Sequence, residues 1–125
     1  MADILVIDDN SAVRLAYRLL LINAGHSVTE AVDGQAGIRC LAIKRFELVI
    51  TDLWMPGLDG FAVIAEAKRL HPGMPVLALT GGALGPGADD PSGRARAAGA
   101  DVVIEKPMLG EGFLVSVEAL LARAS

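Results

Sequence analysis

The sequence predicts an α/β fold in which five strands and five helices alternate and the strands form one doubly wound parallel sheet. Short runs rich in valine, isoleucine and leucine recur along the chain, and segments with the apolar spacing of a helix separate them. The runs are apolar at consecutive positions, which is typical of strands that helices cover on both faces. With 125 residues, of which 53% are hydrophobic, the chain is expected to form one domain over residues 1–125.

The first strand is predicted at 4–7, where the sequence reads ILVI. A helix follows, because apolar residues recur at spacings of three or four after a possible N-cap at Asn10 or Ser11. The residues with this spacing are Val13, Tyr17, Leu20 and Ala24. Gly25 is then a natural end for the helix, since glycine readily adopts the left-handed conformation that terminates helices.

The middle of the chain repeats this order twice. A weaker strand is predicted at 26–31 and a helix at 34–45. A third strand follows at 47–51, and the next helical segment, 60–70, runs into the sequence HPG. Proline and glycine are poor residues for continuing a helix, so this helix is expected to stop there.

The last part of the chain contains a long break between two strands. A strand is predicted at 75–80, and the glycine-rich stretch 81–93, which also contains two prolines, has the composition of a mobile loop. Only 94–98 looks helical before the next strand at 101–105. A final helix at 112–124 completes the predicted order.

Polar side chains stand where the predicted strands end. They are Asp8 and Asp9 after the first strand, Asp52 after the third, Thr80 after the fourth and Lys106 after the fifth. Each has a simple explanation when taken alone: paired aspartates often cap helices, and a lysine before a proline often lies at the surface. Right-handed crossovers, however, bring the carboxyl ends of parallel strands to one edge of the sheet, where α/β proteins bind ligands. The set therefore predicts a functional site.

Composition narrows the class of protein. The net charge is −4 and no cluster of lysine or arginine is present, so direct binding to nucleic acid is not expected. The single cysteine, Cys40, has no partner for an internal disulfide, which suits a reducing compartment. The sequence contains neither an apolar run as long as a membrane span nor a secretory signal, so no membrane insertion and a cytoplasmic location are expected.

The chain resembles, over almost its whole length, the receiver domains of two-component response regulators. The resemblance rests on four motifs: the aspartate pair at 8–9, TDLWMPGLDG at 51–60, LTGG at 79–82 and GADVVIEKP at 99–107. It implies a flavodoxin-like (βα)5 sandwich with the strand order 2-1-3-4-5. It also implies that a histidine kinase or a phosphotransfer protein donates a phosphoryl group to Asp52.

The resemblance further implies a Mg²⁺ site beside the phosphoacceptor. Asp9 would be a direct ligand, Asp8 a ligand partly through water, and Asp52 and the backbone carbonyl of Trp54 further ligands. Mg²⁺ prefers such hard oxygen ligands, and a divalent cation would relieve the repulsion among three carboxylates. The Trp54 side chain would border the site and influence how fast water removes the phosphoryl group; the alternative is a plain exposed aromatic residue.

Thr80 and Lys106 complete the implied site. Lys106 would pair with Asp52 or with a phosphoryl oxygen, Thr80 would hydrogen-bond a second oxygen, and the peptide bond before Pro107 would be cis. Besides Trp54, two features depart from the family pattern. Many receivers have tyrosine or phenylalanine three residues before the lysine, where this chain has Val103, and the 26 positions between Thr80 and Lys106 exceed the family norm by about one helical turn, which favours a short or mobile fourth helix.

The expected role is that of a single-domain response regulator, because the chain ends soon after the last predicted helix. It would be a phosphorelay shuttle or act on a downstream protein, and it would be a phosphoacceptor with self-phosphorylation and self-dephosphorylation only, not an enzyme. Three alternatives stay open. They are a receiver-like interaction module that phosphorylation does not regulate, a receiver fragment of a larger regulator or hybrid kinase, and a small Mg²⁺-dependent phosphatase with an aspartyl intermediate.

Overall fold

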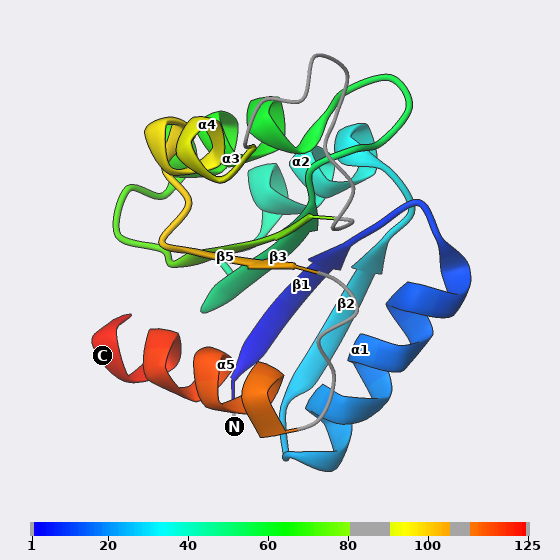
Figure 1. The fold of residues 1–125 in the computed structure, drawn as a ribbon. Helices are drawn as coiled ribbons and strands as arrows, with labels where there is room; N and C mark the ends of the chain where they lie inside the picture. The colour runs from blue at the N-terminus through cyan, green and yellow to red at the C-terminus, as the bar shows by residue number, and fades with distance from the viewer. Residues whose placement is uncertain (1, 81–90, 106–110, 125) are drawn as a thin grey trace.

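The computed structural model describes residues 2–80, 91–105 and 111–124. Its five strands form one parallel sheet in the order β2-β1-β3-β4-β5, as predicted (Figure 1). The strands are β1 Asp3–Ile7, β2 Ser27–Ala31, β3 Leu48–Asp52, β4 Val76–Thr80 and β5 Val102–Glu105. The order reverses between β1 and β3, so the crevice that α/β proteins use for ligands lies at the carboxyl ends of these two strands.

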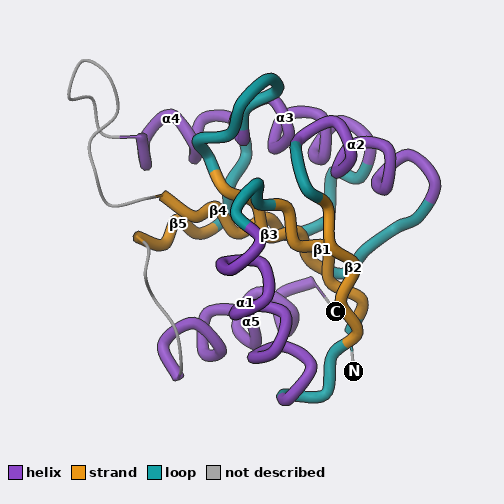
Figure 2. Tube along the Cα trace, turned by 90° about the vertical axis from the view of Figure 1, so that its right-hand side faces the viewer, coloured by secondary structure: helices purple, strands orange, loops and turns teal. Residues whose placement is uncertain are grey.

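Helices cover both faces of the sheet. They are α1 Ser11–Asn23, α2 Gly34–Ile43, α3 Gly60–Leu70, α4 Pro91–Ala98 and α5 Glu111–Ala124. Figure 2 shows α1 and α5 together on one side of the strands and α2, α3 and α4 on the other. None of the helices in the described part of the chain is long and apolar enough to cross a membrane.

Each face of the sheet has its own apolar core. Toward α2, α3 and α4 the core includes Leu5, Ile7 and Val49 from the strands, and toward α1 and α5 it includes Ile4 and Val6. Neighbouring residues of β1 thus point to opposite faces, and the four residues from Ile4 to Ile7 are all buried. This explains why the strand runs are apolar at consecutive positions.

Element boundaries agree with the prediction to within one or two residues, except in α4. This helix begins at Pro91, so the prediction of a loop through 81–93 is wrong for its last three residues. Proline is accepted in the first turn of a helix because the backbone N–H that it lacks has no helical partner there. At eight residues α4 is short, as the sequence favoured, while the stretch 81–90 and its expected mobility lie outside the described residues.

The predicted caps of α1 are confirmed. The side chain of Asn10 accepts hydrogen bonds from the backbone N–H groups of Ala12 and Val13, at 3.0 and 3.1 Å. At the other end Gly25 has a φ of 95°, which is the left-handed conformation expected after a helix. The N-cap matters for the site, because it fixes where the turn after β1 enters α1.

Candidate functional site

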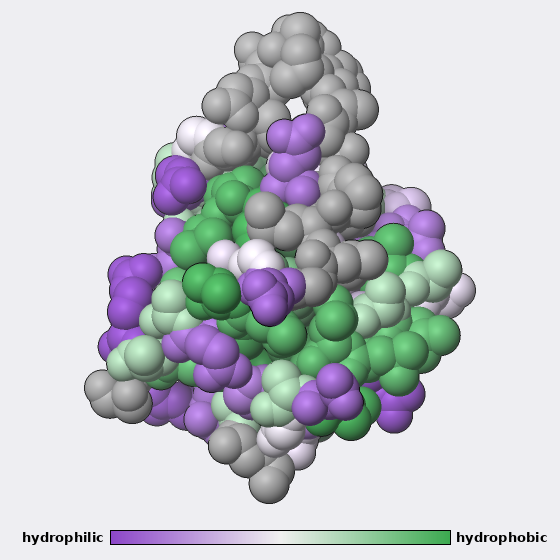
Figure 3. Space-filling model, turned by 60° about the horizontal axis from the view of Figure 1, so that its bottom comes forward, coloured by the Kyte–Doolittle hydropathy of each residue, from purple (hydrophilic) through white to green (hydrophobic). Residues whose placement is uncertain are grey.

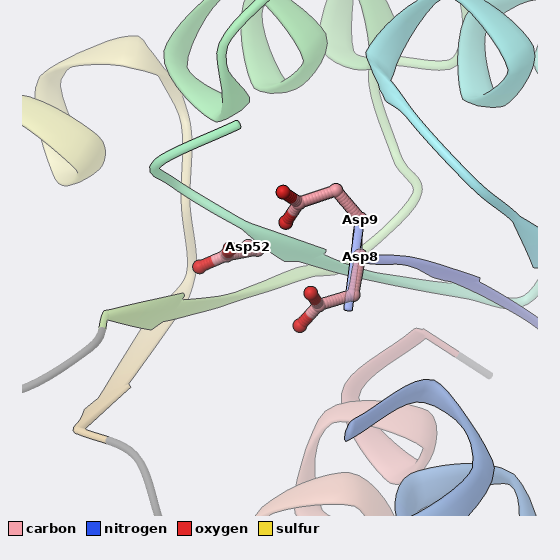
Figure 4. Close-up of side chains that lie close together, drawn as sticks. All are labelled: Asp8, Asp9 and Asp52. Atoms are coloured by element: carbon pink, nitrogen blue, oxygen red, sulfur yellow. The ribbon is translucent and has the colours of Figure 1, made fainter. Parts of the chain in front are cut away.

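Three carboxylates meet at the carboxyl edge of the sheet. Asp8 and Asp9 follow β1, Asp52 is the last residue of β3, and one oxygen from each lies within 4.8 Å of the others. Figure 4 shows the three side chains extending to the same side of the strand ends. Asp8 is fully buried and Asp52 is 5% exposed, whereas Asp9 is exposed. The structure thus brings together the three acids that the sequence placed at two separate strand ends.

The turn after β1 is held by hydrogen bonds to Asp8 on three sides. Its backbone N–H donates to the carbonyl of Ala31 on β2 at 3.2 Å, and its carboxylate accepts from the backbone N–H of Asn10 at 2.9 Å. Its backbone carbonyl accepts a hydrogen bond from Nη1 of Arg14 at 2.8 Å. Asp8 therefore also orders the turn, whereas the N-cap of α1 is Asn10 and not one of the paired aspartates.

The loop after β3 is closed at its base. The backbone N–H of Gly60, the first residue of α3, donates to the carbonyl of Leu53 at 2.9 Å, and the N–H of Leu53 donates to Leu79 on β4 at 3.0 Å. A Cβ atom on Gly60 would lie 2.1 Å from the backbone oxygen of Asp52, so only glycine fits this approach. The start of α3 is consequently packed directly against the backbone of Asp52.

Trp54 lies in this loop, two residues after Asp52. Its side chain is 37% exposed, and its ring meets that of Phe61 edge to face, with 5.4 Å between centroids. Trp54 is therefore exposed, as one of the two sequence interpretations held, and it also packs against Phe61. The indole contacts α3 through Phe61, and part of the residue faces solvent.

Thr80 ends β4 and is 7% exposed. In the sheet register Asp52 of β3 pairs with Leu79 of β4, so Thr80 lies one position beyond the level of Asp52. On its other side β4 pairs with β5, where Thr80 is opposite Glu105. Lys106 and the peptide bond before Pro107 lie outside the described residues. Their assignment stays a prediction from the sequence.

The donor set fits a hard divalent cation. All three side chains offer carboxylate oxygens, two of them in buried positions, and their close approach concentrates negative charge at one point. Mg²⁺ is bound in proteins by one or two carboxylates together with water and phosphate oxygens, whereas softer metals prefer nitrogen or sulfur. The acidic cluster could therefore bind a metal ion of this class.

The sequence did not predict a role for Arg14, whose side chain contacts the site through the backbone carbonyl of Asp8. The sequence shows only an arginine in α1, four residues after the N-cap residue Asn10. A position on a helix does not reveal that a guanidinium reaches a carbonyl oxygen, because every residue has one. The contact is visible only in the folded chain.

The comparison with known families agrees with this geometry. A family model described as the response regulator receiver domain matches residues 4–118. The chain therefore belongs to the response regulator receiver domain family.

Relatives and solved structures support the same assignment. The chain is 33% identical to the transcriptional regulatory protein AfsQ1 of Streptomyces coelicolor, over 98% of this chain and 52% of that protein. It is 37% identical to the response regulator MprA of Mycobacterium sp. strain KMS, over 98% of this chain and 51% of that protein. The chain thus spans about half the length of these curated relatives.

Among solved structures, a CheY-like receiver domain protein from Methanospirillum hungatei superposes with a TM-score of 0.90 at 27% identity, covering 99% of this chain and 96% of that one. A receiver domain protein from Clostridium thermocellum gives a TM-score of 0.87 at 31% identity, covering 98% and 96%. The flavodoxin-like architecture predicted from the sequence is confirmed.

Proposed function

We propose that Asp52 accepts a phosphoryl group from a histidine kinase or a histidine phosphotransfer protein, with Mg²⁺ bound by the acidic cluster. The observation that supports this most directly is the convergence of Asp8, Asp9 and Asp52 within 4.8 Å at the switch point of the sheet. Receiver domains of this family interact with such phosphodonors, and their role is that of a phosphoacceptor.

In the proposed reaction, a carboxylate oxygen of Asp52 forms a bond to phosphorus while the bond from phosphorus to the donor imidazole nitrogen breaks. The products are an acyl phosphate on Asp52 and a histidine without its phosphoryl group. Such a transfer depends on positioning and charge neutralisation more than on a strong nucleophile. Asp52 suits this role because the packing of Gly60 and the β3 ladder fix its backbone.

The other site residues have supporting roles in the proposal. Asp9, Asp8, Asp52 and the backbone carbonyl of Trp54 would hold Mg²⁺. When bound, this ion neutralises charge on the oxygens of the transferring phosphoryl group. Thr80 would donate a hydrogen bond from its hydroxyl to a phosphoryl oxygen, and Lys106 would pair with another.

The phosphodonor has to reach this edge of the sheet, and α1 offers a surface beside it. Leu15, Leu19 and Ile22 lie on one stripe of the helix and are 48%, 56% and 44% exposed. A shallow depression lined by Ala16, Leu19, Leu20 and Asn23 adjoins the stripe. Figure 3 shows apolar side chains gathered on the side of the molecule where α1 lies. We propose that the phosphodonor docks on this α1 stripe, because the helix starts two residues after Asp9.

The natural protein is either a single receiver domain or a longer regulator that contains this domain. We propose that residues 1–125 act as a single receiver domain that signals through protein contacts. The length of the relatives favours the alternative in which the same domain is part of a longer regulator, since the chain spans about half of each. The mass of the natural protein, isolated from its source with an antibody against α5, separates the two forms.

The test of phosphorylation is incubation of the chain with acetyl phosphate and Mg²⁺, followed by measurement of the intact mass. The wild type is expected to gain one phosphoryl group and Asp52→Asn none. Asp59→Asn is the matched control, because Asp59 lies in the same loop and caps α3, and asparagine caps a helix equally well. Equal labelling of wild type and Asp52→Asn would refute the proposal.

The labelling experiment and a turnover assay with a phosphomonoester address the rival functions. An interaction module that phosphorylation does not regulate would stay unlabelled in the wild type under all conditions. A phosphatase would release many equivalents of phosphate from an added phosphomonoester, whereas a receiver modifies only itself. Repeated turnover of such an ester would therefore favour the phosphatase.

A further inference from the structure

The Arg14 side chain joins the turn after β1 to strand β2. Its Nη1 donates to the backbone carbonyl of Asp8 at 2.8 Å, and its Nε donates to Oε1 of Glu30 at 3.2 Å. The side chain is only 14% exposed. Glu30 lies on β2, and its second oxygen is 3.5 Å from Nε of Arg18. Two arginines of α1 thus share one carboxylate, but only Arg14 reaches the acidic cluster.

The hydrogen bond from Arg14 acts on the peptide group between Asp8 and Asp9. The peptide group on the other side of Asp8 is already held by the bond from the Asp8 N–H to Ala31. With both peptide groups fixed, the direction in which the chain leaves Asp8 is fixed as well. That direction sets where the side chain of Asp9 begins.

Asp9 needs such control more than its two neighbours. Asp8 and Asp52 are buried and their side chains have little space in which to move, whereas Asp9 is exposed. Repulsion from the two other carboxylates favours conformations of Asp9 that carry its charge away into water. Holding the peptide group before Asp9 limits this movement while no cation is bound.

We propose that Arg14 is a positioning residue for the Mg²⁺ site: it preorganises Asp9 toward Asp8 and Asp52 through the Asp8 carbonyl. The inference rests on the proposed function, because it concerns the same metal site. Groups that orient metal ligands from outside the coordination sphere contribute about 10- to 100-fold to metal affinity in other proteins. A preorganised ligand set binds more tightly because less freedom is lost on binding.

The positive charge of Arg14 alone would have the opposite effect on Mg²⁺ affinity, so the two explanations can be distinguished by experiment. A guanidinium beside a cation site repels the cation, so removal of its charge alone would strengthen Mg²⁺ binding. Removal would also leave Glu30 with a less compensated negative charge, which acts in the same direction. If Arg14 works by position, the affinity instead falls when it is removed.

Arg18 provides the matched control. It carries the same charge, lies one helical turn further along α1 and contacts the same Glu30 carboxylate. Its substitution by alanine therefore reports the effect of losing a nearby positive charge. The Arg14→Lys variant gives the complementary comparison, because an ammonium keeps the charge but lacks the planar fork that reaches two acceptors at once.

The experiment is a calorimetric titration of the full chain with MgCl2 for the wild type, Arg14→Ala, Arg14→Lys and Arg18→Ala. We expect about tenfold weaker binding for Arg14→Ala, a smaller loss for Arg14→Lys, and unchanged or tighter binding for Arg18→Ala. Thermal melting checks that each variant is folded. If Arg14→Ala does not fold, Arg14→Lys decides, since any loss of affinity there cannot come from charge.

A second measurement follows phosphorylation by acetyl phosphate as a function of Mg²⁺ concentration. For Arg14→Ala the half-saturating Mg²⁺ concentration should rise while the rate at saturating Mg²⁺ stays close to that of the wild type. Binding to Arg14→Ala that is as tight as or tighter than to the wild type would overturn the inference and leave the proposed function intact. A wild type that binds no Mg²⁺ would instead refute the metal site itself, and the inference with it.

Discussion

The guanidinium carbon of Arg94 lies 4.0 Å from the centroid of the Phe61 ring. Arg94 belongs to α4 and Phe61 to α3, and the same phenyl ring meets Trp54 edge to face. Trp54 follows Asp52 by two residues. A chain of contacts therefore connects the candidate phosphoacceptor loop with α4, the shortest of the helices in the described part of the chain.

Removal of the Arg94 side chain is expected to loosen α4. A cation over an aromatic ring at an exposed site contributes about 0.5–1 kcal/mol, so Arg94→Ala should lower the free energy of unfolding by about that amount. Amide hydrogen exchange in α4 should become faster, because the helix loses one of its contacts with α3. Arg96→Ala, an exposed arginine of the same helix, is the control. Equal exchange rates in the two variants would contradict the assigned role of the stack.

Gly60→Ala is expected to destabilise the fold and to disturb Asp52. The added Cβ would lie 2.1 Å from the Asp52 oxygen and 2.6 Å from Cα of Leu53, and neither backbone atom can move aside cheaply. We expect a loss of about 2 kcal/mol in a urea unfolding experiment, although alanine is the better helix former. Gly73→Ala is the matched control, because a Cβ there meets nothing within 4 Å. A loss no larger than in this control would show that the loop after β3 can shift freely.

The convergence of the acids could be predicted from sequence because it follows from topology. Apolar runs located the strands, and polar residues directly after them could only lie at one edge of a parallel sheet. The side chains of Asp8 and Asp52 meet for this reason, although they are 44 positions apart. Local patterns also limited the N-cap of α1 to Asn10 or Ser11, of which the structure shows Asn10, and they placed Gly25 after the end of the helix.

Contacts that depend on packing between elements were beyond this reasoning. The hydrogen bond from Arg14 to a backbone oxygen has no sequence signature, and neither has the stack of Arg94 on Phe61. The start of α4 at Pro91 was missed because glycine and proline composition outweighed the fact that proline is suited to a first helical turn. The contacts of Arg14 and Arg94 depend on how side chains pack between neighbouring elements, which the order of strands and helices does not determine.

Mg²⁺ binding is expected to depend on Asp9 as well as on the two buried acids. Asp9→Ala removes one of the three carboxylates, and affinity for Mg²⁺ depends on the charge of the ligand set, so we expect about a tenfold loss or more. Titration with MgCl2 followed through Trp54 fluorescence measures it, since Trp54 lies in the same loop as Asp52. Asp33→Asn, at the cap of α2, should bind as the wild type does. Unchanged affinity in Asp9→Ala would show that the cation binds elsewhere.

The α1 stripe should matter for a protein donor and not for a small one. Leu15→Ser and Leu19→Ser replace exposed apolar groups, so folding is expected to be little affected, whereas a docked partner loses apolar contact. The rate of phosphoryl transfer should fall with the histidine kinase that labels the wild type fastest in a panel of purified kinases. Labelling by acetyl phosphate should stay the same. Val115→Ser on α5, where the side chain is 67% exposed, is the control, and an equal effect there would remove the case for α1.

Thr80 lies on the side of the sheet that faces α4. Its side chain shares a face with that of Ala78, two positions earlier on β4, and Ala78 belongs to the same apolar core as Ala95 of α4. Val103 pairs with Ala78 in the sheet and packs against this core as well. Valine has no aromatic ring that could change its orientation when Thr80 moves. A change at Thr80 is therefore expected to reach α4 without a conformational change of residue 103.

The last prediction separates phosphate acceptance from signal output. Thr80→Ala should still be labelled by acetyl phosphate, because the acceptor is the carboxylate of Asp52. It should lose the phosphorylation-dependent amide shifts of α4, because no hydroxyl is left to bond the phosphoryl group, while Thr80→Ser should keep them. Val103→Ala should retain most of these shifts. Coupling needs a contact that differs between the two states, and this hydroxyl is the group proposed to make it. If Val103→Ala abolishes the shifts and Thr80→Ala leaves them intact, the signal passes through β5 instead.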